Sequence, residues 1–208
     1  GGSGIRFAGE TTIGAQSPVP FGRIINNTIV GNARSGVGIE VVGLASPTIL
    51  NNILTDLGTG IVDGGVGTVI RTNFFQNNVA NGQAGTASLS GGATGSPFVN
   101  AAQRNFYLLP GSLAVDSSQE TEQDRFNHVT FKNELGIPES PIKAPERDVF
   151  GQLRIDSTGS PVGGGAAVFI DRGAVDRSDV DRPYAQLLNP IDNDSAGQDR
   201  DPNSSVVY

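Results

Sequence analysis

Aspartates near the C-terminal end of the 208-residue chain have the types and spacing best suited to bind an ion. The densest group is Asp192, Asp194, Asp199 and Asp201. Calcium prefers about six to eight oxygen ligands, and Asp192-x-Asp194-x-x-Gly197 combines two carboxylates with a turn glycine as a calcium loop does. We therefore predict that these four aspartates bind calcium. An acidic, solvated linker leading into a following module is the alternative, because Ala196 stands where a third oxygen ligand is expected.

Acidic residues in the first half of the chain are the candidates for glycoside hydrolysis, which needs two carboxylates on one face. Glu40 and Asp63 follow similar Gly-Ile pairs, Gly38-Ile39 and Gly60-Ile61, but at distances that differ by one residue. In a strand, a shift of one residue moves a side chain to the other face. We therefore expect the two carboxylates to lie on opposite faces.

Lyase chemistry would require a basic residue, and the same region offers Arg23, Arg34 and Arg71. We expect Arg71 to be a solvent-facing strand residue and His128, the single histidine, to be an ordinary loop residue. No nucleophile motif or phosphate-binding glycine loop is present. The sequence thus predicts no catalytic residue and no organic cofactor.

Composition narrows the range of partners. The net charge of −7 and pI near 4.6 argue against nucleic acid, which requires clustered Lys and Arg. No segment has the apolar length of a membrane span. Cysteine is absent, which excludes disulfides and thiolate sites, whereas Gly 29 and Pro 12 favour a corner-rich all-β fold.

A repeated phrase sets the elements that must position these residues. It reads IINNTI from Ile24, ILNNIL from Ile49 and, less regularly, VIRTNFF from Val69. The second asparagine of each copy, Asn27, Asn52 and Asn73, recurs after 25 and then 21 residues. A fixed period of this length indicates a stack of similar units. The leucine-dense consensus of the competing leucine-rich repeat is missing.

Each unit also contains a glycine before an isoleucine, as in Gly38-Ile39, Gly60-Ile61 and the earlier Gly4-Ile5. The β-branched and aliphatic runs around these positions are about 4–7 residues long, which predicts short strands separated by Gly or Asn corners. Stacking is expected to give three columns. They are Ile25, Leu50 and Ile70 in the interior, Ile29, Leu54 and Phe75 in the interior, and an asparagine ladder of Asn27, Asn52 and Asn73.

The units resemble those of right-handed parallel β-helix proteins of the pectin-lyase-like superfold. The resemblance continues through SPFVNAAQRNFYLLPGSLAVDSS (96–118), RDVFGQLRID (147–156) and FIDRGAVDRSD (169–179), which are similar to the closing strands of very large secreted or cell-surface proteins of planctomycete-like bacteria. It covers roughly residues 20–180. It implies an all-β, right-handed parallel β-helix (solenoid) with an irregular C-terminal closing segment and an extended acidic tail.

The expected organisation is β-helix coils over 1–118, a charged inserted loop over 119–147, closing strands over 148–180 and an acidic linker over 181–208. Methionine is absent and the chain opens inside a coil-like phrase, so we expect a piece of a longer protein in which upstream coils or a partner cover residues 1–10.

The expected function is that of a non-catalytic structural or adhesive module, outside the cell or on its surface. Expected partners are other modules of the same polypeptide, further copies through the solenoid ends, or a cell-surface or polysaccharide ligand. A carbohydrate-binding or polysaccharide-processing β-helix remains the alternative.

Overall fold

Short parallel strands dominate the computed structural model, which describes residues 2–11, 19–123, 133–154 and 170–177. The prediction of an all-β fold is confirmed for this part of the chain. The parallel strands are β1 (Ser3–Ala8), β2 (Arg23–Ile25), β3 (Thr28–Val30), β4 (Val37–Val42), β5 (Thr48–Leu50), β6 (Ile53–Thr55), β7 (Thr59–Asp63), β8 (Val69–Arg71), β9 (Phe74–Gln76), β10 (Ala80–Gly82) and β11 (Leu89–Ser90).

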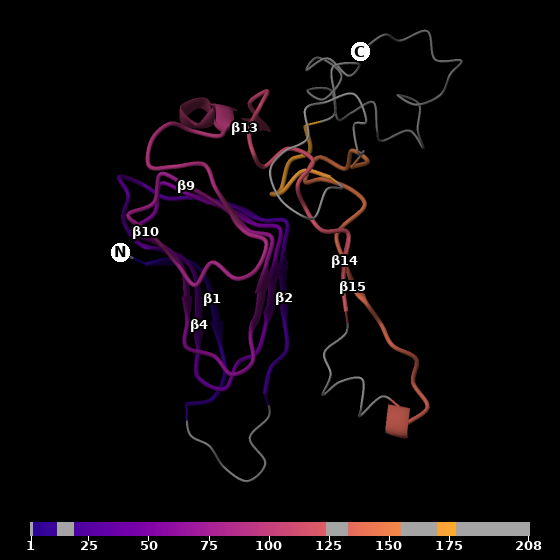
Figure 1. Cartoon of the computed structure of the whole chain (residues 1–208). Helices are drawn as coiled ribbons and strands as arrows, with labels where there is room; N and C mark the ends of the chain where they lie inside the picture. Colours follow the sequence, from indigo (N-terminus) through magenta and orange to yellow (C-terminus); the bar gives the residue numbers. More distant parts are fainter. Residues whose placement is uncertain (1, 12–18, 124–132, 155–169, 178–208) are drawn as a thin grey trace, which may run out of the picture.

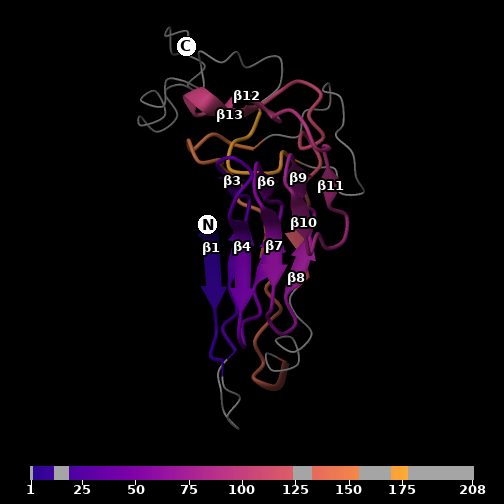
Figure 2. The same ribbon diagram turned by 90° about the vertical axis from the view of Figure 1, so that its left-hand side faces the viewer.

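These strands form three sheets, with orders β1-β4-β7-β10, β2-β5-β8 and β3-β6-β9-β11. The chain visits the sheets in turn, so three consecutive strands make one unit: unit 1 is β1–β3, unit 2 is β4–β6 and unit 3 is β7–β9. Unit 4 consists of β10, an isolated bridge from Arg71 to Thr86, and β11. The units nest on one another in Figure 1, and Figure 2 shows β1, β4 and β7 side by side. Stacked parallel sheets of this kind are compatible with a solenoid.

The register of the strands corrects one predicted column and confirms another. Ile24, Ile49 and Ile70 are aligned across the second sheet, whereas Ile25 is aligned with Leu50 and Arg71. The predicted column of Ile25, Leu50 and Ile70 was therefore wrong, because it mixed two neighbouring positions whose side chains point to opposite faces. The predicted column of Ile29, Leu54 and Phe75 is confirmed.

Aliphatic side chains from all three sheets form the main core. Ile39, Ile49, Leu54 and Ile61 are completely buried there, and Phe75 continues the same cluster. Because each short strand contributes only one or two of these side chains, the core depends on the units being stacked.

Close packing explains the glycine that precedes the isoleucine in each unit. A Cβ atom on Gly38 would lie 2.5 Å from Leu54 Cδ2, and one on Gly60 would lie 2.7 Å from Phe75 Cε1. Real Cβ atoms do not approach so closely. The side chain of the third strand thus occupies the space that any larger residue would need at the start of the first strand.

Asparagine forms the corner between the second and third strands. Asn26 and Asn51 have φ angles of 52° and 57° there, and Thr72 takes the same conformation in unit 3 with φ 50°. Asparagine tolerates this left-handed region better than other residues with a side chain, whereas a β-branched threonine is strained in it. The third copy of the phrase therefore keeps the corner at an energetic cost.

Beyond unit 4 the chain changes to antiparallel pairing. β12 (Phe98–Asn100) pairs with β13 (Asn105–Leu108) across the short 3-10 helix η1 (Ala101–Gln103). Residues 96–118, expected as the last coils, thus start with an antiparallel pair, because Arg104 in the left-handed conformation reverses the chain after η1. β14 (Thr121–Glu122) and β15 (Ile142–Lys143) pair in the same antiparallel way, at the two ends of the charged 119–147 region.

The closing phrases contain little regular structure. In the described parts of the predicted closing strands, 148–154 and 170–177, the chain forms turns and one isolated bridge between Arg147 and Leu153. Over the described residues, no helix is long and apolar enough to span a membrane.

Candidate functional site

The residues predicted to bind calcium cannot be placed. Asp192, Asp194, Asp199 and Asp201 lie outside the described residues, as does His128. Within the described ranges, no group of three or more His, Cys, Asp or Glu side chains is arranged to hold a metal ion.

The two acids considered for hydrolysis do not form a pair. Glu40 is aligned with Val62, whereas Asp63 is aligned with the buried Val41, so the register puts the two carboxylates on opposite faces, as predicted. Glu40 Oε2 accepts hydrogen bonds from Ser3 Oγ at 2.7 Å and from Arg6 Nε at 3.1 Å. Both contacts join neighbouring strands of the first sheet, and the pair with Arg6 is largely exposed.

Arg71 connects the units to the following hairpin. Its Nη1 lies 3.3 Å from Glu122 Oε2, and the arginine side chain is 46% exposed. Next to it, Asn51 Nδ2 donates to the carbonyl oxygen of Gln119, and Gln119 N–H donates back to Asn51 Oδ1. The antiparallel hairpin β14–β15 therefore lies against the second sheet (Figure 1).

The predicted asparagine ladder is confirmed. The backbone N–H and the Nδ2 of Asn27 both donate to Asn52 Oδ1, at 2.9 and 3.0 Å. Asn52 repeats the pattern with Asn73 Oδ1, at 2.9 Å for both bonds. Asn52 and Asn73 are completely buried, so these bonds satisfy amides that would otherwise be costly to bury.

A second column of corner residues runs beside this ladder. Asn51 Nδ2 donates to Asn26 Oδ1 at 3.3 Å, and Thr72 Oγ1 donates to Asn51 Oδ1 at 2.6 Å. Asn26 Nδ2 donates in turn to the carbonyl oxygens of Asp171 and Gly173. The corner thus becomes the attachment site for a segment about 145 residues further along the chain.

That segment, residues 171–174, contacts every unit, and we call it the axial segment. Ala174 N–H donates to Thr28 Oγ1 in unit 1, and Gly173 N–H donates to the carbonyl oxygen of Asn51 in unit 2. Arg172 donates to the carbonyl oxygens of Asn73 in unit 3 and Ala87, which precedes β11, in unit 4. In Figure 2 this part of the chain, in yellow, runs across the row of units near β3 and β6.

Arg172 is the most buried charged group of the axial segment. Its side chain has no exposed surface, and its guanidinium also donates to the carbonyl oxygen of Ser117 from Nε at 2.9 Å and Nη2 at 2.7 Å. Burial lowers the pKa of Arg172 to about 9, which leaves it charged at neutral pH. Planar guanidinium groups suit such an array, because they present several donors in a fixed geometry.

A second buried arginine, Arg154, also donates to this segment. Arg154 donates from Nη1 to the carbonyl oxygen of Asp171 at 3.2 Å and from Nη2 to that of Gly173 at 2.7 Å. Its Nη1 also lies 3.7 Å from Asp176 Oδ1. Burial lowers the pKa of Arg154, whereas Asp176 and Asp148 act in the opposite direction.

Two buried aspartates complete the cluster. Asp171 accepts from Asp116 N–H and Arg177 N–H, and Asp148 accepts from the backbone N–H groups of Phe150 and Gln152. Burial raises the pKa of Asp171 well above its ordinary value, and the nearby Asp176 raises it further. Burial also raises the pKa of Asp148. These carboxylates thus organise backbone turns in the closing part of the chain.

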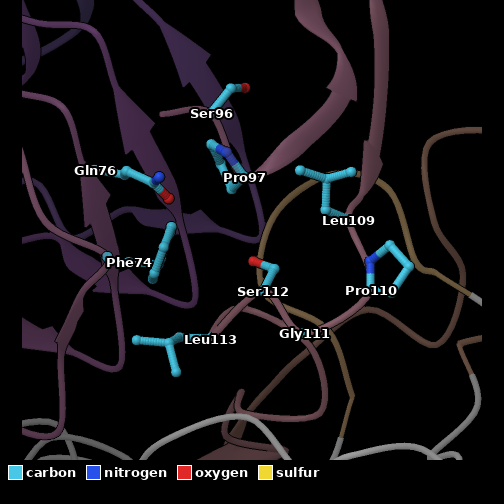
Figure 3. Close-up of a pocket in the computed structure, with 10 residues that line it drawn as sticks. Phe74, Gln76, Ser96, Pro97, Leu109, Pro110, Gly111, Ser112 and Leu113 are labelled. Atoms are coloured by element: carbon cyan, nitrogen blue, oxygen red, sulfur yellow. The ribbon is translucent and has the colours of Figure 1, made fainter. Parts of the chain in front are cut away.

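A groove of about 230 Å³ lies between unit 3 and the closing part. Figure 3 shows Phe74 and Gln76 on one side and Leu109 and Pro110 on the other, with Ser112 between them. The remaining lining residues in the described part of the chain are Gly91, Ser96, Pro97, Gly111 and Leu113, and none of them has an ionisable side chain. Ser112 Oγ already accepts from Ala114 N–H. From the described residues, the groove therefore offers polar and apolar contacts but no acid or base.

No family model matches this chain. No curated protein and no solved structure matches it either.

The sequence prediction missed the axial segment and its arginines. In FIDRGAVDRSD and RDVFGQLRID, charged residues lie between apolar residues, where unpaired charges are rare. That mixture was the available signal for a buried ionic cluster. It did not identify the partners, because most of them are backbone carbonyl oxygens from distant units.

Proposed function

We propose that the chain is a right-handed parallel β-helix segment with a closing region, acting as a non-catalytic structural or adhesive module of a larger extracellular or cell-surface protein. The axial segment is the observation that supports this proposal. Each of the four units contributes at least one hydrogen bond to residues 171–174. A segment that connects all units resists their separation along the stack, which suits a rigid spacer.

The buried charges support the same proposal. Arg172 and Arg154 use their donors on backbone carbonyl oxygens, and Asp148 uses its carboxylate on backbone N–H groups. Catalytic groups must reach a substrate, whereas these groups hold parts of the same chain together. We propose calcium binding by Asp192, Asp194, Asp199 and Asp201 as an additional stabilising element of the tail.

A polysaccharide assay tests the proposal against its enzymatic alternative. The full chain is incubated with a panel of acidic polysaccharides, with and without calcium, and products are measured by reducing-end release and by absorbance of unsaturated ends. We expect no turnover with any member of the panel. Turnover that is lost in Glu40→Gln or Asp63→Asn, with Glu139→Gln as an exposed control, would overturn the structural proposal.

A further inference from the structure

The asparagine ladder has a direction along the stack. Asn27 donates to Asn52, and Asn52 donates to Asn73, always from the backbone N–H and Nδ2 to Oδ1. Asn73 N–H then donates to Ser88 Oγ at 3.0 Å, and Ser88 Oγ donates to the carbonyl oxygen of Ala84. The donor end of the ladder is thus closed inside the molecule.

The acceptor end of the ladder is open. Oδ1 of Asn52 and Oδ1 of Asn73 each accept two hydrogen bonds from the preceding unit. Among the described residues, none donates a hydrogen bond to Asn27 Oδ1, although the backbone carbonyl oxygen of Asn27 accepts one from Ile53 N–H at 2.8 Å. The position in front of Asn27 Oδ1 therefore fits the backbone N–H group of a unit stacked before unit 1, just as Asn52 Oδ1 accepts the N–H group of Asn27 in unit 1.

The strands at this end are also incompletely covered. β1, β2 and β3 are each the terminal strand of their sheet. Ile5, Phe7 and Ile29 are only partly buried, whereas the residues aligned with them in unit 2 are completely buried. Those residues are Ile39, Val41 and Leu54. A layer with the shape of one more unit would complete the burial of all three side chains.

We propose that this face binds one further repeat unit of the same type, oriented in the same direction, whose ladder residue, the one equivalent to Asn27, donates its backbone N–H to Asn27 Oδ1. The inference deepens the proposed function and rests on it, because it specifies the neighbour of a spacer module. The ladder's direction selects this occupant over a second copy. Two copies meeting face to face would bring two acceptor ends of the ladder together. A copy approaching with its other end would offer no ladder donor, because the last donor, Asn73 N–H, already bonds to Ser88 Oγ.

An inserted unit in the full chain tests the proposal. A copy of residues 37–58 is placed directly before Ser3. This junction keeps the natural register, because Ser3 is aligned with Val37 and Val37 with Thr59, the residue that follows Gly58 in the native chain. The carbonyl oxygen of Gly2 accepts from Val37 N–H, so the backbone groups of Gly2 face β4. Backbone groups of successive residues point to alternate edges of a strand, so the N–H groups of Ile5 and Phe7 face the open edge of β1. We expect hydrogen exchange of these two amides to slow at least tenfold, measured by NMR.

The matched control carries the same insertion with one additional alanine before Ser3. This shift turns the apolar side chains of the inserted unit to the wrong face, so we expect no added protection of Ile5 and Phe7. Equal protection in both variants, or none in either, would overturn the proposal.

The unmodified chain supplies a second measurement that does not depend on the inserted unit folding. We expect a monomer in sedimentation, with the amides of Ile5 and Phe7 exchanging faster than those of Ile39 and Val41. A concentration-dependent dimer that protects β1 would identify a second copy as the occupant and contradict the inference. Because this experiment measures only the end face, it can fail while the polysaccharide assay still supports the structural function.

Discussion

At the scale of single residues, the corner position shows how sequence and backbone conformation fit together. Asn26 and Asn51 suit a positive φ, and their side chains bond along the stack. Thr72 adopts the same conformation with a β-branched side chain and keeps one bond, to Asn51 Oδ1. A left-handed conformation costs a residue other than glycine roughly 1–2 kcal/mol, and asparagine less than most.

We expect Thr72→Asn to stabilise the protein by about 0.5–1 kcal/mol, because it removes part of this strain while its Nδ2 can donate to Asn51 Oδ1. Chemical denaturation monitored by circular dichroism measures the change. Thr72→Val is the control, since it keeps the β-branch and loses the hydroxyl, and it should be less stable than the parent chain. A Thr72→Asn variant less stable than the parent would show that the corner is not strained.

The sequence predicted the structure better at the scale of single residues than at the larger scales. The ladder of Asn27, Asn52 and Asn73 follows from the repeated phrase, because like residues stack on like residues. The interior column at Ile70 was wrong, since Ile70 lies three residues before its ladder asparagine, as Ile24 and Ile49 do, whereas Ile25 and Leu50 lie two residues before theirs. The spacing from the asparagine thus already matches Ile70 with Ile49, and the strand register agrees with it.

At the scale of elements, buried acids gather around the axial segment, with Asp171 inside it and Asp148 and Asp176 beside it. Asp171 and Asp148 both have raised pKa values because of burial, and Asp171 also faces Asp176. Arg154 pairs with Asp176 and Arg172 donates to carbonyl oxygens, whereas the Asp171 carboxylate accepts from the backbone N–H groups of Asp116 and Arg177. Protonation of Asp171 therefore relieves repulsion in the folded state.

This arrangement predicts the direction of the pH dependence. The folded-state pKa of Asp171 lies above its unfolded value near 4, so its contribution to stability is complete below about pH 4 and is lost as the pH rises through the folded-state pKa. Asp148 acts in the same direction. We expect Asp171→Asn to reduce the decline of the unfolding free energy between about pH 4 and pH 7, measured by urea denaturation at several pH values.

The exposed substitution Glu139→Gln is the control and should keep the pH profile of the parent chain. An identical profile in Asp171→Asn would mean that the burial of this carboxyl group has no energetic effect.

The contacts of the axial segment were not predictable from the sequence in detail. The partners of Asp171 and Arg172 are backbone groups, and these groups reach their positions only after the units have stacked.

At the scale of the whole molecule, the axial segment changes how the units depend on one another. In a simple repeat protein each unit contacts only its neighbours, so the ends can open while the middle stays folded. Here residues 171–174 bond to all four units, and Gly173 is central to the contact. A Cβ atom on Gly173 would lie 2.6 Å from Ile53 Cδ1 and 2.7 Å from Thr28 Oγ1, at a φ of +91°.

We therefore expect Gly173→Ala to detach the axial segment and to reduce the cooperativity of unfolding as well as the stability, by about 2–4 kcal/mol from strain and overpacking together. Gly92→Ala is a matched control, because Gly92 has a φ of +96° and nothing within 4 Å of a new Cβ atom. It imposes a similar backbone strain without the clash. Native-state hydrogen exchange should show units 1 and 4 opening before units 2 and 3 in Gly173→Ala, whereas all units open together in Gly92→Ala and in the parent chain. If units 1 and 4 already opened independently in the parent chain, the axial segment would contribute nothing to their coupling.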